Sequence, residues 1–331
     1  SDMYTLGYNF RPWSDPQAIA DGPSILSYIK ETAKEYRIDE QIRYQKKVTK
    51  AAWCSDTALW TVTVNDGASG DTDSFTCAVL HMCAGYYSYR EGYTPEFPGK
   101  ERFGGALIHP QDWPAQLDYS GKRVVVIGSG ATAITLVPAL TAKAKHVTML
   151  QRSPTYVVSW PEEDGFANRM MKLLPAKLAY RLARFKNVHT QQYLYGLTQM
   201  FPRRSKSVLI DRLRKEVGPD VDVERHFTPS YNPWQQRICL SPNGDIFESL
   251  KEGRASVVTG SIKTFTEAGV ELESGEVIPA DIIVTATGLK LVAFGEVEFS
   301  VDGEAVDFSK TWTYKGLAAS GVPNFFSCFG Y

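Results

Sequence analysis

The sequence predicts an α/β protein with a parallel sheet and an insertion of helices. Two short apolar runs, residues 124–127 and 147–150, have the length and composition of buried parallel strands. A glycine-rich turn follows the first run directly, and a helical pattern over residues 132–141 connects it to the second run. Strand, turn, helix and strand in this order form a βαβ unit, which is the building block of parallel sheets.

The turn between the first strand and the helix carries the dinucleotide-binding fingerprint G-x-G-x-x-A. It reads Gly128-Ser129-Gly130-Ala131-Thr132-Ala133. In this pattern the first glycine makes the tight turn, the second lets the backbone approach a phosphate, and the small last residue permits close packing of the helix on the strand. The N-terminus of the helix then offers free N–H groups to the anion. We therefore predict that residues 128–132 bind a dinucleotide, in preference to forming a purely structural turn.

The residues after the second strand indicate which dinucleotide binds. A site for NAD carries an acidic residue at this point for the ribose hydroxyls, whereas this chain has Gln151-Arg152-Ser153. An arginine forms charge-assisted hydrogen bonds to a 2′-phosphate. The sequence therefore predicts NADPH, with Arg152 as the phosphate clamp and Ser153 as a second donor. The alternative is an exposed arginine that only ends the strand.

The other predicted elements follow from periodicity and from turn-forming residues. In chain order they are a helix over 23–37, strands at 42–53, 60–65 and 75–82, a linker rich in Gly, Pro and aromatic residues over 86–118, helices after Pro161, and strands at 255–259, 269–273 and 281–285.

The predicted helices after Pro161 are basic. Between Arg169 and Lys215 every charged residue except Asp211 is Arg or Lys, and apolar residues recur at helical spacing, namely Leu173, Leu174, Leu178, Leu182 and Phe185. The favoured interpretation is an amphipathic insertion that packs its apolar face on the nucleotide-binding domain. The second interpretation is contact with a membrane surface or with a hydrophobic substrate, since a basic amphipathic helix suits both.

Composition excludes several classes of function. The chain has 331 residues and a net charge of −1, so no global field attracts nucleic acid. Its five cysteines are dispersed without C-x-x-C spacing, which argues against a zinc site or a disulfide framework and suits the reduced thiols of a cytoplasmic protein. No apolar run is long enough to span a bilayer. The sequence has no spacing of His, Cys, Asp or Glu that predicts a metal site, and it does not indicate an oligomeric state.

A second motif lies ahead of the nucleotide fold, in the predicted linker. Residues 103–114 match the pattern F-x-G-x-x-x-H-x-x-x-W-P, with Phe103, Gly105, His109, Trp113 and Pro114 at its fixed positions. In this motif the chain resembles the Baeyer–Villiger monooxygenases, a branch of the flavin-containing monooxygenases. Further similar segments are residues 83–87, 151–154 and 281–289, and residues 1–10 and 231–237 resemble more narrowly the ethionamide-activating branch of that family.

The resemblance implies a flavoprotein with two dinucleotide-binding domains, in which a Rossmann-like NADPH domain is inserted into an FAD domain. It also implies an internal fragment, because the N-terminal FAD-binding βαβ unit, an aspartate expected just before Ser1 and a C-terminal segment do not occur in the sequence. Such a fragment alone is expected to be inactive. The implied divisions are an FAD-domain part (1–85), the linker (86–118), the NADPH domain (119–160 and 231–285), the helical insertion (161–230) and a return to the FAD domain (286–331).

The resemblance also assigns roles to residues. Arg237, at the end of residues 231–237, falls at the position of a catalytic arginine that keeps a flavin C4a-peroxide deprotonated. The alternatives are a solvent-facing arginine without a catalytic role and an arginine that merely stacks on the ring of Trp234. Gln236 replaces a lysine that is frequent in the wider family and assists the NADPH phosphate, so phosphate binding is expected to depend more on Arg152.

Two further pairs of residues are expected at the connections between domains. His109 and Trp113 are interpreted as residues that fix the linker by hydrogen bonding and packing, in preference to His109 acting as a general base. Thr287 and Gly288 follow a predicted buried strand and are expected to contact the flavin, with a purely structural turn as the alternative.

The resemblance implies an FAD- and NADPH-dependent enzyme that transfers one oxygen atom of O₂ to a small hydrophobic ketone or sulfide. Another flavin-containing monooxygenase of the N- or S-oxidising type stays open as an alternative, as does a non-catalytic nucleotide-binding piece. A flavin-dependent disulfide reductase would need a redox cysteine pair, and the sequence has none.

Overall fold

The computed structural model describes residues 2–328. The chain forms two compact units, the first made of Ser1–Tyr36 with Tyr93–Gly288 and the second of Arg37–Gly92 with Leu289–Tyr331. Ser1 and residues 329–331, which belong to the predicted FAD-domain parts, lie outside the described residues.

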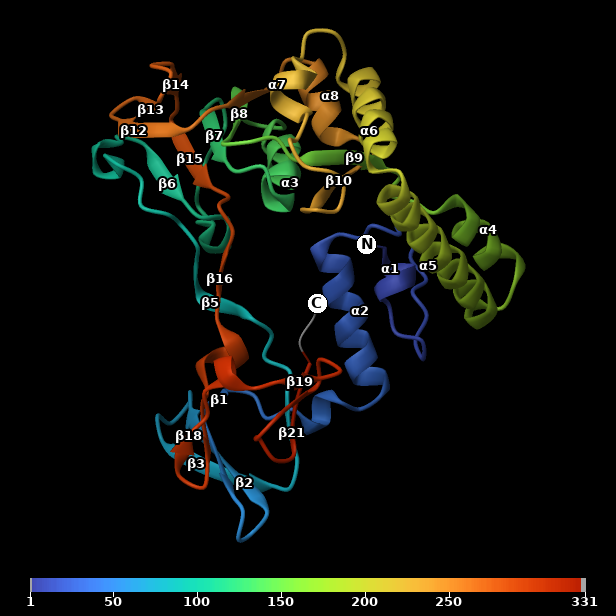
Figure 1. Cartoon of the computed structure of the whole chain (residues 1–331), viewed down its shortest axis with the longest axis vertical. Coiled ribbons are helices and arrows are strands. Elements are labelled where there is room, and N and C mark those ends of the chain that lie inside the picture. The colour runs from blue at the N-terminus through green and yellow to red at the C-terminus, as the bar shows by residue number, and fades with distance from the viewer. Residues whose placement is uncertain (1, 329–331) are drawn as a thin grey trace. The chain divides into compact units, whose positions relative to one another are not determined.

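A five-stranded parallel sheet forms the centre of the first unit (Figure 1). Helix α3 (Ala131–Leu140) connects the strands at 123–127 and 146–151, as predicted. The strand order is β11-β8-β7-β15-β6. From β7 the chain proceeds to β8 and β11 on one side, whereas β15 and β6 lie on the other side, so the direction across the sheet reverses between β7 and β15. Ligands of open α/β sheets bind at the carboxyl end of the strands at this kind of switch point. The strands are β6 (Ala106–Ile108), β7 (Arg123–Ile127), β8 (His146–Gln151), β11 (Ala255–Thr259) and β15 (Ile282–Thr285).

Both faces of this sheet are covered, which explains why its strands are continuously apolar. Along β7, Val124 and Val126 belong to one buried cluster and Val125 and Ile127 to another, because side chains alternate across a strand. The first cluster includes residues of α3, α6 (Pro202–Val217) and α8 (Asp245–Lys251). The second cluster lies under a three-stranded antiparallel sheet, β12 (Ile262–Thr266), β13 (Gly269–Leu272) and β14 (Val277–Pro279).

The predicted linker over 86–118 is partly a strand of the central sheet. Residues 106–108, inside the F-x-G-x-x-x-H-x-x-x-W-P motif, pair with β15 in parallel as the edge strand β6. Gly105 brings the backbone close enough for this pairing, since a Cβ there would lie 2.3 Å from the carbonyl oxygen of Asp281. Sequence patterns miss so short a strand because its partner is far along the chain.

An ion pair connects the amino ends of β7 and β15. The Arg123 guanidinium donates to both carboxylate oxygens of Asp281, at 2.7 and 3.1 Å, and the Arg123 backbone N–H donates to the same carboxylate. These contacts lower the pKa of Asp281 to about 2. The pair fixes the register of the two strands that flank the switch point.

Helices occupy the predicted insertion, but its apolar face does not pack as expected. Leu173, Leu178, Leu182 and Phe185 are exposed, so the expectation that the apolar face packs on the nucleotide-binding domain is wrong for α4 and α5. It holds for α6, whose buried residues belong to the first cluster of the central sheet. Helix α5 instead buries Ala179, Tyr180, Ala183 and Asn187, and two of these are small enough to let α1 and α4 approach closely. Within residues 2–328, no helix is both long and apolar enough to cross a bilayer. The helices are α4 (Gly165–Leu173), α5 (Ala176–Met200), α6 and α7 (Val223–Phe227).

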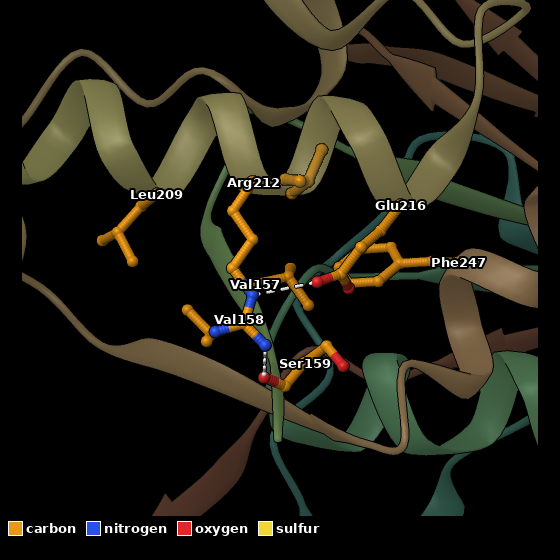
Figure 2. A pocket seen from close by; sticks show the side chains of 8 residues that line it. Val157, Val158, Ser159, Leu209, Arg212, Glu216 and Phe247 are labelled. Atoms are coloured by element: carbon orange, nitrogen blue, oxygen red, sulfur yellow. Dashed lines mark hydrogen bonds and ion pairs between the residues drawn. The ribbon is translucent and has the colours of Figure 1, made fainter. Parts of the chain in front are cut away.

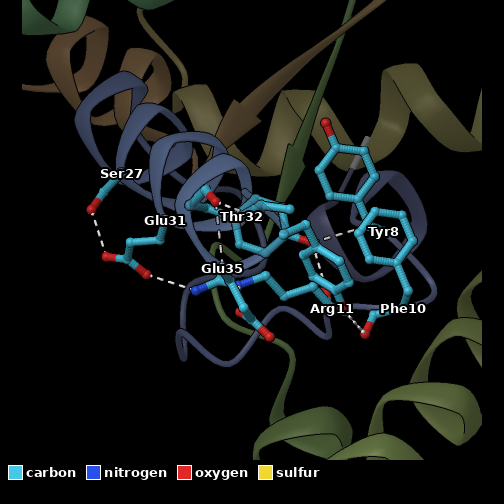
Figure 3. Close-up of polar contacts among 9 residues, drawn as sticks. Tyr8, Phe10, Arg11, Ser27, Glu31, Thr32 and Glu35 are labelled. Carbon is cyan, nitrogen blue, oxygen red and sulfur yellow. Dashed lines mark hydrogen bonds and ion pairs between the residues drawn. The ribbon is translucent and has the colours of Figure 1, made fainter. Parts of the chain in front are cut away.

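The predicted division also differs at the N-terminus, because residues 2–36 pack with these helices rather than with residues 37–85. Figure 3 shows how Arg11 holds this segment: its guanidinium donates to Glu31 and Glu35 of α2 (Gly22–Glu35) at 2.8 Å each. The Tyr28 hydroxyl donates to the carbonyl oxygen of Arg11. Helix α1 (Met3–Leu6) then contacts α5, where the Tyr180 hydroxyl donates to the carbonyl oxygen of Gly7 at 2.8 Å.

The second unit is built from β-strands around a core of aromatic rings that includes Trp53, Trp60, Phe299 and Phe325. One sheet has the order β18-β17-β1-β2-β3 and another the order β19-β20-β21-β4. The strand predicted at 75–82 is thus two strands in different sheets. The strands are β1 (Lys46–Cys54), β2 (Leu59–Asp66), β3 (Thr72–Cys77), β4 (Leu80–Met82), β5 (Tyr87–Gly92), β16 (Leu289–Leu291), β17 (Glu298–Val301), β18 (Glu304–Ala305), β19 (Thr313–Tyr314), β20 (Ala318–Ala319) and β21 (Phe325–Ser327).

Candidate nucleotide-binding site

The glycine-rich turn lies between the carboxyl ends of β8 and β15. The Gly128 N–H donates to the carbonyl oxygen of Leu150 at 2.8 Å, and a Cβ on Gly128 would lie 2.3 Å from the carbonyl oxygen of Ala286. Its φ of 135° is one that side-chain-bearing residues rarely adopt. The turn therefore needs glycine at this position for two separate reasons.

The N-terminus of α3 is open toward the carboxyl edge of the sheet. Gly130 is its N-cap, and no side chain accepts a hydrogen bond from the first turn. Ala131 and Thr132 are exposed, while Ala133 is fully buried against the sheet. A Cβ on Gly130 would have no protein atom within 4 Å. The free N–H groups and the open space above Gly130 together fit a phosphate.

Exchanging each of the two glycines for alanine should separate folding from binding. We expect Gly128→Ala to lower the free energy of unfolding by on the order of 1–3 kcal/mol, because the φ angle and the contact with Ala286 both become strained. Gly130→Ala should cost at most about 1 kcal/mol but weaken NADPH binding about tenfold, since its methyl group enters the phosphate space. Urea unfolding and calorimetric titration measure the two effects. A Gly128→Ala variant as stable as the wild type would contradict this account.

The buried side-chain amide of Gln151 fixes the carboxyl end of β8. The Gln151 side chain donates to the carbonyl oxygen of His226 at 2.7 Å and to the Thr259 hydroxyl at 2.9 Å. His226 Nδ1 lies 2.7 Å from the same hydroxyl, and burial lowers the pKa of this imidazole. Sequence reasoning missed this network, because its members come from three separate segments.

Arg152 and Ser153 emerge from this fixed strand end. Arg152 is exposed, and no described side chain forms an ion pair with it. The Ser129 hydroxyl donates to the carbonyl oxygen of Ser153 at 3.5 Å, which ties this loop to the glycine-rich turn. The structure therefore brings the predicted phosphate turn and the predicted 2′-phosphate residues together on one edge of the sheet.

The segment that carries Gln236 and Arg237 reaches the same edge through a pair of strands that the sequence did not reveal. Strand β10 (Ile238–Pro242) pairs in parallel with β9 (Tyr156–Trp160), which follows the Arg152 loop. The Thr155 hydroxyl donates to the carbonyl oxygen of Arg237 at 3.4 Å, and the Cys239 thiol lies 3.7 Å from the carbonyl oxygen of Ser129. Both Gln236 and Arg237 are exposed.

Of the two alternatives for Arg237, stacking on Trp234 finds no support among the described residues, whereas a solvent-facing arginine agrees with its exposed position. The Trp234 ring packs edge to face on Tyr195 of α5, with 5.8 Å between ring centroids. Trp234 also has a φ of 68°, which is rare for a bulky residue. The turn before Arg237 is therefore backbone-constrained and contacts the helical insertion.

The histidine of the F-x-G-x-x-x-H-x-x-x-W-P motif is fixed at both ring nitrogens. The Gln111 backbone N–H donates to His109 Nδ1 at 3.1 Å, so Nε2 carries the proton of the neutral ring and donates to the carbonyl oxygen of Gly288 at 2.9 Å. Gly288 has a φ of 110° and is the last residue of the first unit. Thr287 donates to the carbonyl oxygen of Tyr93 at 2.6 Å.

The other motif residues are packing residues. Phe103 packs edge to face on Phe265, and Trp113 on Tyr119. Pro114 accepts a hydrogen bond from the Leu117 N–H at its carbonyl oxygen. The motif thus anchors the segment that leaves the first unit at Gly288.

A small cavity lies elsewhere, between β9, α6 and α8. Figure 2 shows Arg212 extending from α6 across it, to Glu216 at 3.0 Å and to the carbonyl oxygen of Ser159 at 3.1 Å. Since its polar groups hydrogen-bond and ion-pair with one another, this cavity is a small gap in the packing between the three elements and not a candidate binding site. The described residues also contain no group of three or more His, Cys, Asp or Glu side chains placed to hold a metal ion.

A parallel sheet with a glycine turn at its switch point and an exposed arginine after the strand that follows it defines a dinucleotide-binding α/β protein. The sequence profile of the flavin-binding monooxygenase-like family matches residues 14–218. The FAD-containing monooxygenase EthA of Mycobacterium tuberculosis is 50% identical over 332 residues, a match that covers 100% of this chain and 68% of EthA. EthA of Mycolicibacterium smegmatis is 48% identical, with 100% and 67% covered. The chain belongs to the flavin-binding monooxygenase-like family.

Solved structures agree on the fold. An oxidized steroid monooxygenase bound to NADP matches with a TM-score of 0.79 and 22% identity, over 98% of this chain and 70% of that protein. A cyclohexanone monooxygenase bound to ε-caprolactone matches with a TM-score of 0.79 and 19% identity, over 98% and 72%. The predicted family and the predicted class, a flavoprotein with two dinucleotide-binding domains, are confirmed.

Proposed function

We propose that this chain forms the NADPH-binding part of an FAD- and NADPH-dependent monooxygenase that transfers one oxygen atom of O₂ to a ketone or a sulfide. The observation that carries the proposal is the meeting of three segments at one edge of the parallel sheet: the glycine-rich turn, the Arg152–Ser153 loop and the segment that ends in Arg237. Their hydrogen bonds to one another hold these segments in place before any ligand binds.

The chain's own groups suit each part of NADPH. The N–H groups of the first turn of α3, with Ser129 and Thr132 beside them, bind the pyrophosphate. Arg152 and Ser153 bind the 2′-phosphate, and Gln236 adds an uncharged donor at the same edge. When bound, NADPH supplies a hydride. The role of the chain is to fix the two phosphate groups and so to orient the rest of the cofactor.

Arg237 supplies a permanent positive charge at the edge of the sheet where this site lies. A guanidinium remains charged where water is excluded and stabilises negative charge on a reacting oxygen. The FAD named in the relatives supplies the oxygen-activating chemistry when bound. The chain has one glycine fingerprint, at 128–133, so we assign no residue of this chain to the FAD pyrophosphate.

In this proposal, the motif around His109 fixes the end of the segment that connects the two units. His109 holds the carbonyl group of Gly288, after which the chain enters the second unit. Thr287 and Gly288 then reach the flavin, and residues 37–92 and 289–328 belong to the FAD domain. A hydrogen-bonded ring at such a connection suits a hinge better than a general base, because both ring nitrogens are already engaged.

Two measurements test the proposal. Calorimetric titration of the chain should give an affinity for NADP⁺ at least about tenfold higher than for NAD⁺, as expected for a charge-assisted phosphate contact. A restored enzyme that contains the FAD-binding βαβ unit, loaded with FAD and given NADPH and O₂, should then convert cyclic ketones to lactones or sulfides to sulfoxides, as product analysis would show. Equal affinities would contradict the assignment of NADPH, and NADPH oxidation without oxygenated product from either class would contradict the proposed reaction.

A further inference from the structure

Helices α4 and α5 carry an unbalanced positive charge. Every charged residue between positions 165 and 210 is Lys or Arg, although the whole chain has a net charge of −1. Lys186 pairs with Asp164, and Arg184 donates to the carbonyl oxygens of Tyr4 and Gly7. Four exposed cations of these two helices have no acidic partner among the described residues. They are Arg169, Lys172, Lys177 and Arg181.

An apolar stripe runs along α5, and α4 ends in a further exposed leucine. Leu178, Leu182 and Phe185 follow one another at spacings of four and three residues, so they lie on one face of α5. They are 47%, 40% and 63% exposed, and Leu173 at the end of α4 is 65% exposed. The opposite face of α5 contacts the rest of the first unit through Tyr180 and its neighbours. The stripe is therefore directed away from the protein's own core.

The cations border this stripe. Lys177 and Arg181 each precede a stripe leucine by one position, which places them about 100° around the helix and next to the stripe along its length. Lys172 stands in the same relation to Leu173. Long basic side chains at such positions lay their methylene stems along apolar surface and extend the charge beyond it.

We propose that the outer face of α4 and α5 binds the surface of a bilayer that contains anionic phospholipids. Charge complementarity selects this occupant: the head groups pair with the four cations, while Leu173, Leu178, Leu182 and Phe185 enter the boundary between head groups and acyl chains. An acidic soluble partner would leave the stripe in water, and a purely apolar partner would bury the cations unpaired. The contact is peripheral and does not depend on the bound nucleotide.

Vesicle flotation of the intact chain tests this proposal. We expect binding to vesicles of phosphatidylcholine mixed with phosphatidylglycerol, and little binding to phosphatidylcholine alone. Arg169→Gln, Lys172→Gln, Lys177→Gln and Arg181→Gln combined should reduce the affinity by about tenfold or more. A matched control removes four exposed lysines from other surfaces, Lys30, Lys34, Lys143 and Lys145, and should bind like the wild type.

A second variant tests the apolar half of the surface. Leu178→Gln combined with Phe185→Gln should also weaken vesicle binding about tenfold, while circular dichroism and the melting temperature stay near the wild-type values because both side chains are exposed. The proposal is overturned if the wild type does not bind anionic vesicles, if the basic variant and its control bind equally, or if the apolar variant binds like the wild type. Vesicle-independent self-association that disappears in the apolar variant would instead assign the face to a second copy of the chain, which also overturns it.

Discussion

Replacement of Arg152 by alanine is expected to weaken NADPH binding about ten- to hundredfold and to leave NADH binding nearly unchanged. A charge-assisted contact to a phosphate contributes roughly 1.5–3 kcal/mol, and only NADPH carries a phosphate at this position. The structure strengthens this expectation, because Arg152 is exposed, has no acidic partner among the described residues and follows a strand end fixed by Gln151. No other side chain has to be released before it binds the ligand.

Calorimetric titration of both nucleotides against wild type and variant measures the effect. Arg203→Ala on α6 is a matched control, since it removes another exposed arginine from a different surface. Arg152→Lys should fall between wild type and alanine, because an ammonium keeps the charge and loses the two-pronged geometry. Equal losses for NADPH and NADH in Arg152→Ala would show that Arg152 does not contact the 2′-phosphate.

Replacement of Arg237 by alanine in a restored, FAD-loaded enzyme that contains the FAD-binding βαβ unit is expected to uncouple NADPH oxidation from product formation. NADPH should still be consumed, but the reacting oxygen would lose its stabilising cation, and the electrons would leave as hydrogen peroxide, one molecule for each NADPH and O₂. Loss of one preorganised electrostatic partner costs about a hundredfold or more in such steps. Arg237 lies immediately before β10, two residues ahead of the Cys239 contact with the glycine-rich turn, and it is exposed, which leaves its guanidinium available for this role.

The ratio of product formed to NADPH consumed decides this prediction, with peroxide measured in parallel. Arg237→Lys is the informative companion, since it retains a charge and should recover part of the coupling. Slower flavin reduction by itself would not count against the role, because an arginine at this edge of the NADPH site can also position the nicotinamide. An alanine variant that keeps wild-type coupling would remove Arg237 from the catalytic assignment.

Local sequence determined the nucleotide fold and the family. The apolar runs at 124–127 and 147–150, the glycine turn between them and the helix after it are all short-range signals, and each corresponds to an element of the structure. The motif at 103–114 identified the family because its spacing is unusual. These features were readable because strand periodicity, turn chemistry and motif spacing depend on neighbours along the chain.

Tertiary structure alone decided which segments meet. It made residues 106–108 an edge strand, placed Arg237 beside the turn through the pairing of β9 with β10, and joined Gln151 to His226 and Thr259. It also turned the apolar face of α5 outward, because the small residues Ala179 and Ala183 form the face that packs. An amphipathic pattern identifies two faces of a helix, but which face is buried depends on the partner that reaches it, and that partner is set by contacts between residues far apart in the sequence.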